Sequence, residues 1–252
     1  MANSVQESKV EDLKTKHNVK PHFIPYRYRV FGGILHSMNI QFGNFIEKAV
    51  HEILSSNSKL EIVAKYSGKK QNKFKLSIES EALIDRYITN RQTSPLSESD
   101  LKNAYDNLIK QIKVNESNPK VQTVDFKHDI DALFREKSSD IYYYVEIKYN
   151  DDHDTGKFVD INRKFLKTYA YIIRELGAHA EVKPILFFFT NNIMKGNIYI
   201  PESEVIYRGK RFFDRFTNIK YEDVDRYMKN ISEDPNTKKI FDDLYTKVIK
   251  SI

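Results

Sequence analysis

The segment Ile141–Tyr149, with the sequence IYYYVEIKY, has the clearest structural pattern in this chain. Its β-branched and aromatic residues predict a strand. Because side chains alternate in direction along a strand, Glu146 and Lys148 share one face. They stand at the carboxyl end of a mostly apolar segment, where ligand sites of open α/β sheets gather. The stretch therefore predicts a core strand that ends in two functional side chains.

The segments on either side of this strand complete a core. Upstream, Val121–Phe126 and Ile130–Phe134 are expected to be extended. Downstream, Lys157–Leu176 has apolar residues along one side, which predicts a helix, and Val182–Thr190 (VKPILFFFT) is a near-continuous apolar strand. A strand, a helix and a strand in this order predict a parallel crossover. We therefore expect an α/β fold (α+β-like) in which a central mixed β-sheet is flanked by helices.

The rest of the chain is expected to add helices at both ends of a core at about 121–190, giving one catalytic domain over residues 1–252. The last 30 residues are expected to be helical. The other expected elements are a turn at Gly32-Gly33, an amphipathic helix over Gln41–Leu54, a hairpin of Leu60–Tyr66 with Phe74–Ile78, a loop over Asn90–Ser99, and a helix over Asp100–Val114 that Ser97 and Asp100 cap.

Composition excludes several classes of site. The chain has no cysteine, so disulfides, thiolate metal sites and cysteine nucleophiles are ruled out. No apolar run approaches the ~18 residues of a membrane span, and the first residues are polar, so we expect a cytoplasmic protein. The net charge of +6 suits a polyanionic partner. A lysine-rich proteome from an AT-rich genome explains this charge equally well.

Two aspartates precede the central strand. Asp129 and Asp131 are two residues apart, which would place them on one face, and an antiparallel pairing would bring Asp131 beside Glu146. Two carboxylates form a hard oxygen site of the kind that Mg²⁺ prefers, and Lys148 would add a positive charge within reach of an attacking water. This trio predicts metal-assisted phosphodiester chemistry.

The spacing Glu-x-Lys is not informative by itself, because it also occurs at Glu7/Lys9 and at Glu181/Lys183. The first of these pairs lies in a polar leader, and the second begins a strand rather than ending one. Only Glu146/Lys148 follows an apolar strand with aspartates just upstream. An incidental ion pair on a surface hairpin is the simpler alternative.

This arrangement resembles the PD-(D/E)XK nuclease superfamily and, within it, the type II restriction endonucleases. The residues that carry the resemblance are Asp129-Ile-Asp131, Val145-Glu146-Ile147-Lys148, the helix from Lys157 and the strand Ile185–Phe189. This sequence departs from the family in having no proline before the aspartate. The choice between Asp129 and Asp131 as metal ligand therefore stays open, and Asp131 is preferred because it directly precedes an apolar run.

The resemblance implies a function and partners. It implies Mg²⁺-dependent hydrolysis of double-stranded DNA at specific sites, leaving 5′-phosphate ends, with metal on Asp131 and Glu146 and with Lys148 orienting water. It also implies a bacterial or archaeal homodimer that matches a palindromic site, together with a companion DNA methyltransferase. A repair or junction-resolving nuclease, or a non-catalytic DNA-binding module on a nuclease-like core, is the alternative.

The resemblance also extends to the segment Ser37–Glu47, which looks like the first helix of many restriction endonucleases. There a helix glutamate points toward the metal centre. By position this residue is Glu47, with Glu52 as the other candidate, and a solvated helix charge is the simpler explanation.

Candidate DNA contacts are basic and amide side chains on expected loops and on the helix after the central strand. Ordinary surface polarity explains each of them as well. They are Arg91, Lys157, Arg163, Asn191 and Arg208.

Overall fold

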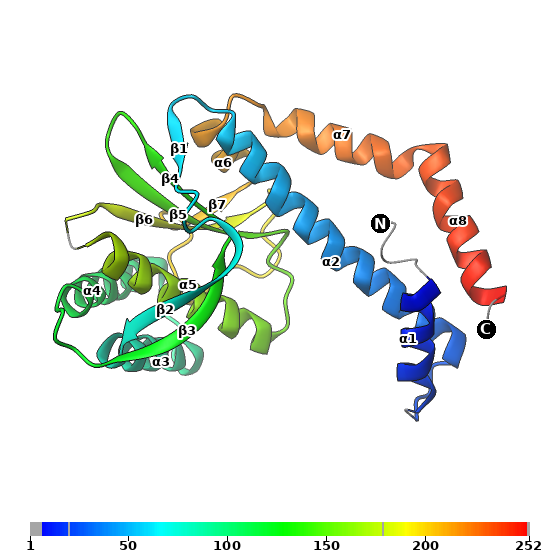
Figure 1. The fold of residues 1–252 in the computed structure, drawn as a ribbon, viewed down its shortest axis with the longest axis horizontal. Coiled ribbons are helices and arrows are strands. Elements are labelled where there is room, and N and C mark those ends of the chain that lie inside the picture. The colour runs from blue at the N-terminus through cyan, green and yellow to red at the C-terminus, as the bar shows by residue number, and fades with distance from the viewer. Residues whose placement is uncertain (1–6, 20, 178, 251–252) are drawn as a thin grey trace. The chain divides into compact units, whose positions relative to one another are not determined.

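The computed structural model describes residues 7–19, 21–177 and 179–250 (Figure 1). The helices are α1 (Glu7–Asn18), α2 (Tyr26–Ser55), α3 (Ile78–Thr93), α4 (Glu98–Glu116), α5 (Thr155–Leu176), α6 (Gly209–Phe216), α7 (Tyr221–Glu233) and α8 (Pro235–Lys250). The strands are β1 (Leu60–Ile62), β2 (Gly68–Ser77), β3 (Thr123–Ile130), β4 (Ala132–Glu136), β5 (Ile141–Lys148), β6 (Val182–Phe188) and β7 (Ile206–Arg208).

The chain divides into two compact units. One comprises residues 1–48 and 219–252, and the other comprises residues 49–218. The sheets and the expected core lie in the second unit. That a single catalytic domain spans residues 1–252 stays a prediction. In the part of the chain that is described, no helix combines the length and the apolar character needed to span a membrane.

A five-stranded sheet in the order β1-β4-β5-β6-β7 forms the centre of the second unit. Strands β1, β4 and β5 pair antiparallel, whereas β5, β6 and β7 pair parallel. The sheet is therefore mixed and carries helices on its faces, as the sequence predicts. The strand predicted at Ile141–Tyr149 is β5, and its parallel partner β6 follows the crossover helix α5.

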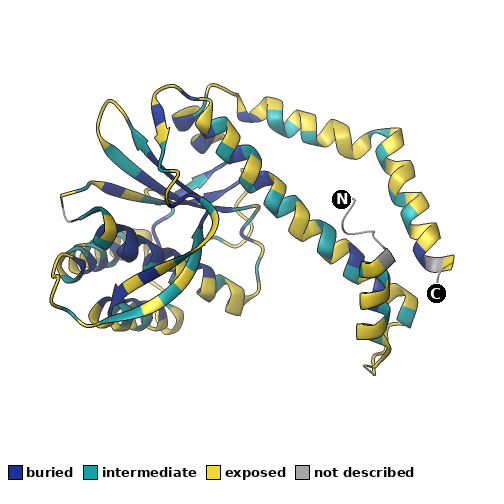
Figure 2. Ribbon diagram, viewed as in Figure 1, coloured by how far each residue is buried: buried dark blue, intermediate teal, exposed yellow. Residues whose placement is uncertain are grey.

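Helix α5 covers one face of the sheet. Asp154 accepts a hydrogen bond from the N–H of Lys157 and caps the first turn, and Gly177 ends the helix with a φ of +85°, a conformation that favours glycine. Phe165 of α5 stacks on Tyr144 of β5 with ring centroids 5.3 Å apart, and both side chains are fully buried. Burial of a side chain such as Phe165 contributes about 1.5–3 kcal/mol. Figure 2 shows this buried interior of α5 and the central strands.

Helix α6 covers the opposite face of the sheet. Phe212 stacks on Phe187 of β6 at 4.0 Å, and Phe216 meets Tyr143 of β5 edge-on at 4.9 Å. Side chains on alternating positions of β5 thus pack against different helices. The face that carries Tyr144, Glu146 and Lys148 is the α5 face.

The expected hairpin of Leu60–Tyr66 with Phe74–Ile78 is wrong. β1 pairs with β4, and β2 pairs with β3 in a separate two-stranded sheet. Both segments find partners distant in the sequence, because those partners supply the apolar faces that bury them. Local alternation of apolar residues predicts a strand but not its partner.

The loop expected over Asn90–Ser99 is shorter than predicted. Helix α3 continues to Thr93, so Asn90 to Thr93 are helical. The start of the next helix agrees with the prediction: Ser97 accepts a hydrogen bond from the N–H of Asp100 and donates one to the Asp100 carboxylate.

The turn expected at Gly32-Gly33 is also wrong, because α2 runs through both glycines. In this first unit, a Cβ on Gly33 would lie 2.7 Å from Leu13 Cδ2 of α1. Gly33 therefore permits a close approach of helices rather than a change of direction. Leu13 forms a small buried cluster with Val30, Ile34 and Val248.

Candidate active site

Asp131, Glu146 and Lys148 come together at the carboxyl end of β5. Ala132 pairs with Val145 in the antiparallel β4–β5 ladder, so the chain position before Ala132 stands level with Glu146. Lys148 Nζ donates to Glu146 Oε1 at 2.7 Å and lies 3.5 Å from Asp131 Oδ2. The predicted adjacency of Asp131 and Glu146 is therefore present in the structure.

Asp131 occupies the bend between β3 and β4. Its side chain is 13% exposed, and its Oδ2 accepts a 2.7 Å hydrogen bond from the N–H of Ile147. Burial and the neighbouring Glu146 charge raise the pKa of Asp131 to about 6, although Lys148, the Ile147 amide and His128 act in the opposite direction. Two carboxylates held this close favour a cation between them.

A network of hydrogen-bonded side chains holds Glu146 in place. The hydroxyl of Tyr144 donates to Glu146 Oε2 at 3.2 Å. The Thr168 side chain of α5 hydrogen-bonds Tyr144 and lies 3.1 Å from Nδ1 of His128 on β3. Burial lowers the pKa of His128, which favours a neutral imidazole. This network links the orientation of Glu146 to β5, α5 and β3.

Asp129 makes different contacts from Asp131. It lies on β3, and its Oδ1 accepts a 2.5 Å hydrogen bond from the N–H of Gln71 in the bulge of the β2–β3 ribbon. Gln71 has a φ of +46°, so this bond supports a left-handed residue. The expectation that both aspartates share one face of one strand is wrong, because β3 ends at Ile130 and Asp131 follows it.

The donor set fits a hard divalent cation. Asp131 and Glu146 present two carboxylates from adjacent chain segments, and Mg²⁺ takes one or two carboxylates and completes its shell with water and phosphate oxygens. No group of three or more His, Cys, Asp or Glu side chains suited to a metal occurs among the described residues. The site thus matches a metal shared with a phosphate substrate better than an all-protein cage.

The two helix glutamates, Glu47 and Glu52, belong to different units. Glu47 is on α2 in the first unit, whereas the trio belongs to the second. Glu52 is exposed on the last turns of α2, which lead to β1. β1, which follows α2, begins at Leu60 and pairs there with Glu136 of β4. Glu136 in turn pairs with Ile141 at the amino end of β5, whereas Lys148 lies at the carboxyl end. A role for Glu47 stays a prediction.

Three of the candidate DNA contacts lie on helices. Arg91 is in the last turn of α3, not on a loop, and its guanidinium lies 5.8 Å from the Tyr87 ring centroid. Lys157 is exposed in the first turn of α5. Arg163, also on α5, forms ion pairs with Asp85 at 3.0 Å and Asp160 at 3.4 Å.

The other two candidates lie beyond β6. Asn191 is exposed, and its Oδ1 accepts a 3.1 Å hydrogen bond from the N–H of Lys210 at the start of α6. Arg208 is buried, with its guanidinium 2.6 Å from Glu202 and 3.1 Å from Asp151. Arg208 is therefore engaged in ion pairs inside the protein, and its role as a DNA contact stays a prediction.

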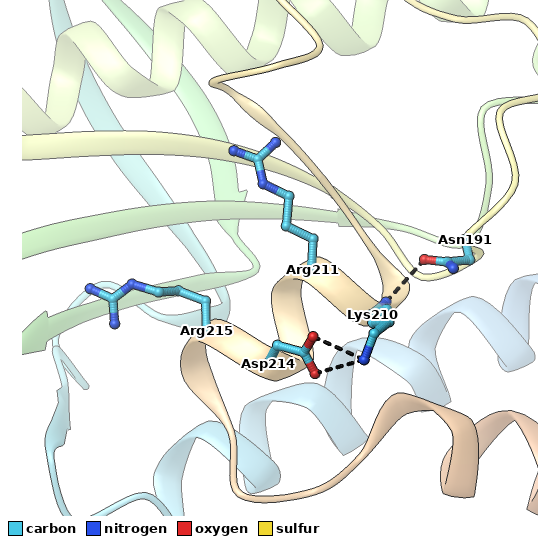
Figure 3. A pocket seen from close by; sticks show the side chains of 5 residues that line it. All are labelled: Asn191, Lys210, Arg211, Asp214 and Arg215. Carbon is cyan, nitrogen blue, oxygen red and sulfur yellow. Dashed lines mark hydrogen bonds and ion pairs between the residues drawn. The ribbon is translucent and has the colours of Figure 1, made fainter.

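Sequence reasoning missed a basic hollow on α6. The hollow has a volume of about 560 Å³ and is lined by Asn191, Lys210, Arg211, Asp214 and Arg215 (Figure 3). Lys210 pairs with Asp214 at 3.0 Å, and the Arg211 guanidinium lies 4.1 Å from the Tyr207 ring centroid. The adjacent basic residues Lys210 and Arg211 indicate a positively charged segment in the sequence, but only the fold shows that they line a hollow.

The comparisons with known proteins identify a family. The model of the HinfI family, described as type II restriction endonucleases, matches residues 1–232. The type II restriction enzyme HinfI of Haemophilus influenzae is 52% identical over 249 residues, covering 99% of this chain and 93% of that protein. No solved structure matches. Because the family model and this relative each cover nearly the whole chain, the chain belongs to the HinfI family of type II restriction endonucleases.

Proposed function

We propose that this protein hydrolyses double-stranded DNA at a specific sequence with Mg²⁺ as its metal and leaves 5′-phosphate ends. The observation that carries the proposal is the cluster of Asp131, Glu146 and Lys148 at the carboxyl end of β5. Membership of a family of site-specific deoxyribonucleases supports the reaction class. The metal, the ends and the roles of the residues are the proposal.

Asp131 and Glu146 would hold the metal. Asp129, as an additional ligand, and Glu47, as a helix glutamate directed at the metal, would be further catalytic residues. When bound, Mg²⁺ would supply Lewis-acid chemistry that polarises the phosphodiester and makes water more acidic. The two carboxylates would offer the ion a defined position, since Asp131 is held by the Ile147 amide and Glu146 by Tyr144. Each ligand is thus oriented before the metal binds.

Lys148 would orient the attacking water and stabilise charge on the phosphate. Its ammonium group lies within ion-pair distance of both carboxylates, at 2.7 Å from Glu146 and 3.5 Å from Asp131. A point charge in this place lowers the energy of the pentacoordinate transition state. It also offsets the repulsion between the carboxylates in the absence of metal.

The partners follow from the same proposal. A homodimer would place two such sites across the two-fold axis of a palindromic sequence, so that both strands are cut. A companion DNA methyltransferase would protect the host DNA in the cytoplasm of the cell that makes the enzyme.

Digestion of unmethylated phage DNA tests the proposal. The purified protein is incubated with the DNA at a range of Mg²⁺ concentrations and without metal, and the products are separated and their ends mapped. Discrete fragments that need Mg²⁺ and share one sequence at their ends are expected. A smear would indicate a nonspecific nuclease. Cleavage of branched DNA only would indicate a junction-resolving enzyme, and no cleavage of any substrate a binding module.

A further inference from the structure

The loop that follows β6 is held at the carboxyl edge of the sheet by one buried carboxylate. Asp151, whose side chain is 1% exposed, accepts hydrogen bonds from the N–H groups of Met194 at 3.0 Å, Lys195 at 3.3 Å and Gly196 at 3.0 Å. Arg208 adds an ion pair at 3.1 Å. Hydrogen bonds from backbone N–H groups to a buried carboxylate are strong, so they hold the backbone of this loop in one conformation.

The same loop begins beside the catalytic lysine. The N–H of Phe189 donates to the carbonyl of Lys148 at 2.8 Å, and the N–H of Thr190 donates to Tyr149 at 2.9 Å. Further along, Lys195 Nζ donates to the carbonyl of His153 at 2.5 Å. The chain after β6 therefore follows the chain after β5, which begins at Lys148.

The tip of the loop exposes two large apolar side chains. Ile193 is 61% exposed and Met194 is 54% exposed, although Asp151 is buried directly beneath them. Because the loop backbone is already held by Asp151, a partner that covers these side chains has to order only the side chains themselves and not the backbone. At the root of the loop, Asn191 joins the basic hollow that contains Lys210 and Arg211.

We propose that Ile193 and Met194 determine sequence specificity by contacting base edges of the DNA, in particular the C5 methyl of a thymine in the major groove. Apolar side chains recognise this methyl group, whereas the cations of the hollow suit the phosphate backbone. Duplex DNA is the partner that presents both groups side by side. The proposal rests on the site-specific cleavage proposed above, and it makes Asp151 the positioning residue of the loop.

The test compares the double variant Ile193→Ala/Met194→Ala with the wild type on duplexes that contain the mapped site. kcat/KM is measured for this site, for sites with one base pair changed, and for sites with one thymine replaced by uracil, which lacks the methyl. Val114→Ala, at an α4 position that is 72% exposed, is the matched control. Sedimentation velocity reports the oligomeric state of each protein.

In the wild type, uracil at the contacted position should lower kcat/KM about tenfold. In the double variant the intact site should already be cut about tenfold more slowly, and the same uracil should have no further effect, because the two changes remove one contact. Val114→Ala should behave as the wild type. Binding to DNA without the site should be unchanged in all three proteins.

Three results would overturn the inference while leaving the proposed function intact. The first is that the uracil substitution and the double variant lower kcat/KM independently at every thymine of the site. The second is a mapped site that contains no A·T pair. The third is a changed oligomeric state of the double variant, which would make the tip an interface between copies. A wild type that cleaves no DNA would instead overturn the proposed function, and this inference with it.

Discussion

The N–H of Ile147 donates to the carboxylate of Asp131 at 2.7 Å, so the strand that carries Glu146 and Lys148 also holds the opposing aspartate. The side chains of Glu146 and Lys148 leave β5 on one face, and the backbone between them orients Asp131. The register of β4 on β5 therefore determines the site. A slip of one residue would turn Glu146 and Lys148 to the α6 face and separate them from Asp131.

Replacing either Glu146 or Lys148 by alanine should abolish cleavage without unfolding the protein. Removal of one group that stabilises charge in a transition state costs about 10²–10³ in rate, and Glu146 would in addition be lost as a metal ligand. Rates of phage DNA cleavage and circular dichroism melting curves measure the two effects.

The controls for this prediction are Glu181→Ala and Lys183→Ala. These residues have the same spacing and form an ion pair at 3.3 Å, but they stand at the amino end of β6 and are exposed. Both variants should cleave at the wild-type rate. Rapid cleavage by the Glu146 and Lys148 variants would show that the site lies elsewhere.

Tyr144→Phe should weaken metal binding while the fold is kept. The change removes the hydrogen bond of 3.2 Å to Glu146 Oε2 but retains the ring that stacks on Phe165. Loss of a group that orients a metal ligand typically costs about 10–100-fold in affinity or activity. The Mg²⁺ concentration for half-maximal cleavage, and calorimetric titration with Mg²⁺ in the absence of DNA, measure this effect.

Tyr169→Phe is the matched control for Tyr144→Phe. Tyr169 is also a buried tyrosine, and its hydroxyl has no hydrogen-bond partner among the described residues. Its removal should leave metal affinity unchanged and stabilise the protein by about 1 kcal/mol, because an unsatisfied polar group is no longer buried. An equal loss of metal affinity in both variants would argue against the proposed orientation of Glu146.

Asp151→Asn should destabilise the protein by about 3 kcal/mol at neutral pH, because Arg208 would be left buried with a weakened ion pair. Burial favours a raised pKa for Asp151, but the amides of Gly196, Met194 and Lys195 and the charge of Arg208 outweigh it, so the pKa is lowered. The carboxylate therefore stabilises the fold above its unfolded pKa of about 3.9, and this is lost as the pH falls through the lower folded value.

Urea unfolding of wild type and Asp151→Asn at several pH values tests this sign. The difference in unfolding free energy should be constant from pH 7 down to about pH 5 and should shrink below about pH 4. A difference that grows as the pH falls would contradict the assignment of a lowered pKa.

Glu116→Ala should destabilise the second unit without altering the catalytic rate of the molecules that remain folded. Glu116 is fully buried and accepts hydrogen bonds from the hydroxyl of Ser77 at 2.5 Å and from Arg174 Nε at 2.7 Å. Breaking a buried ion pair on one side costs about 3 kcal/mol. The active-site fraction, from titration with DNA, separates this loss from a loss of rate. A reduced rate per active site would show that the pair also acts on catalysis.

The strands at the centre of the fold were predictable because burial on both faces leaves a clear local pattern. Ile141–Tyr149 and Val182–Thr190 are apolar enough to identify β5 and β6, and the amphipathic stretch between them identifies α5. Strand partners had weaker signals. The segment after Leu60 pairs with β4 across more than 70 positions of sequence, which local alternation does not encode.

The chemistry of the candidate site was predictable from local sequence: two carboxylates and a lysine, no thiol, and a strand that places Glu146 and Lys148 on one face. Alternation along a strand is a local property, so it needs no knowledge of the fold. The tertiary structure decided between Asp131 and Asp129 as the neighbour of Glu146, buried Arg208, and fixed the loop of Ile193 and Met194 over Asp151. These outcomes depend on contacts between residues far apart in the chain, which only packing establishes.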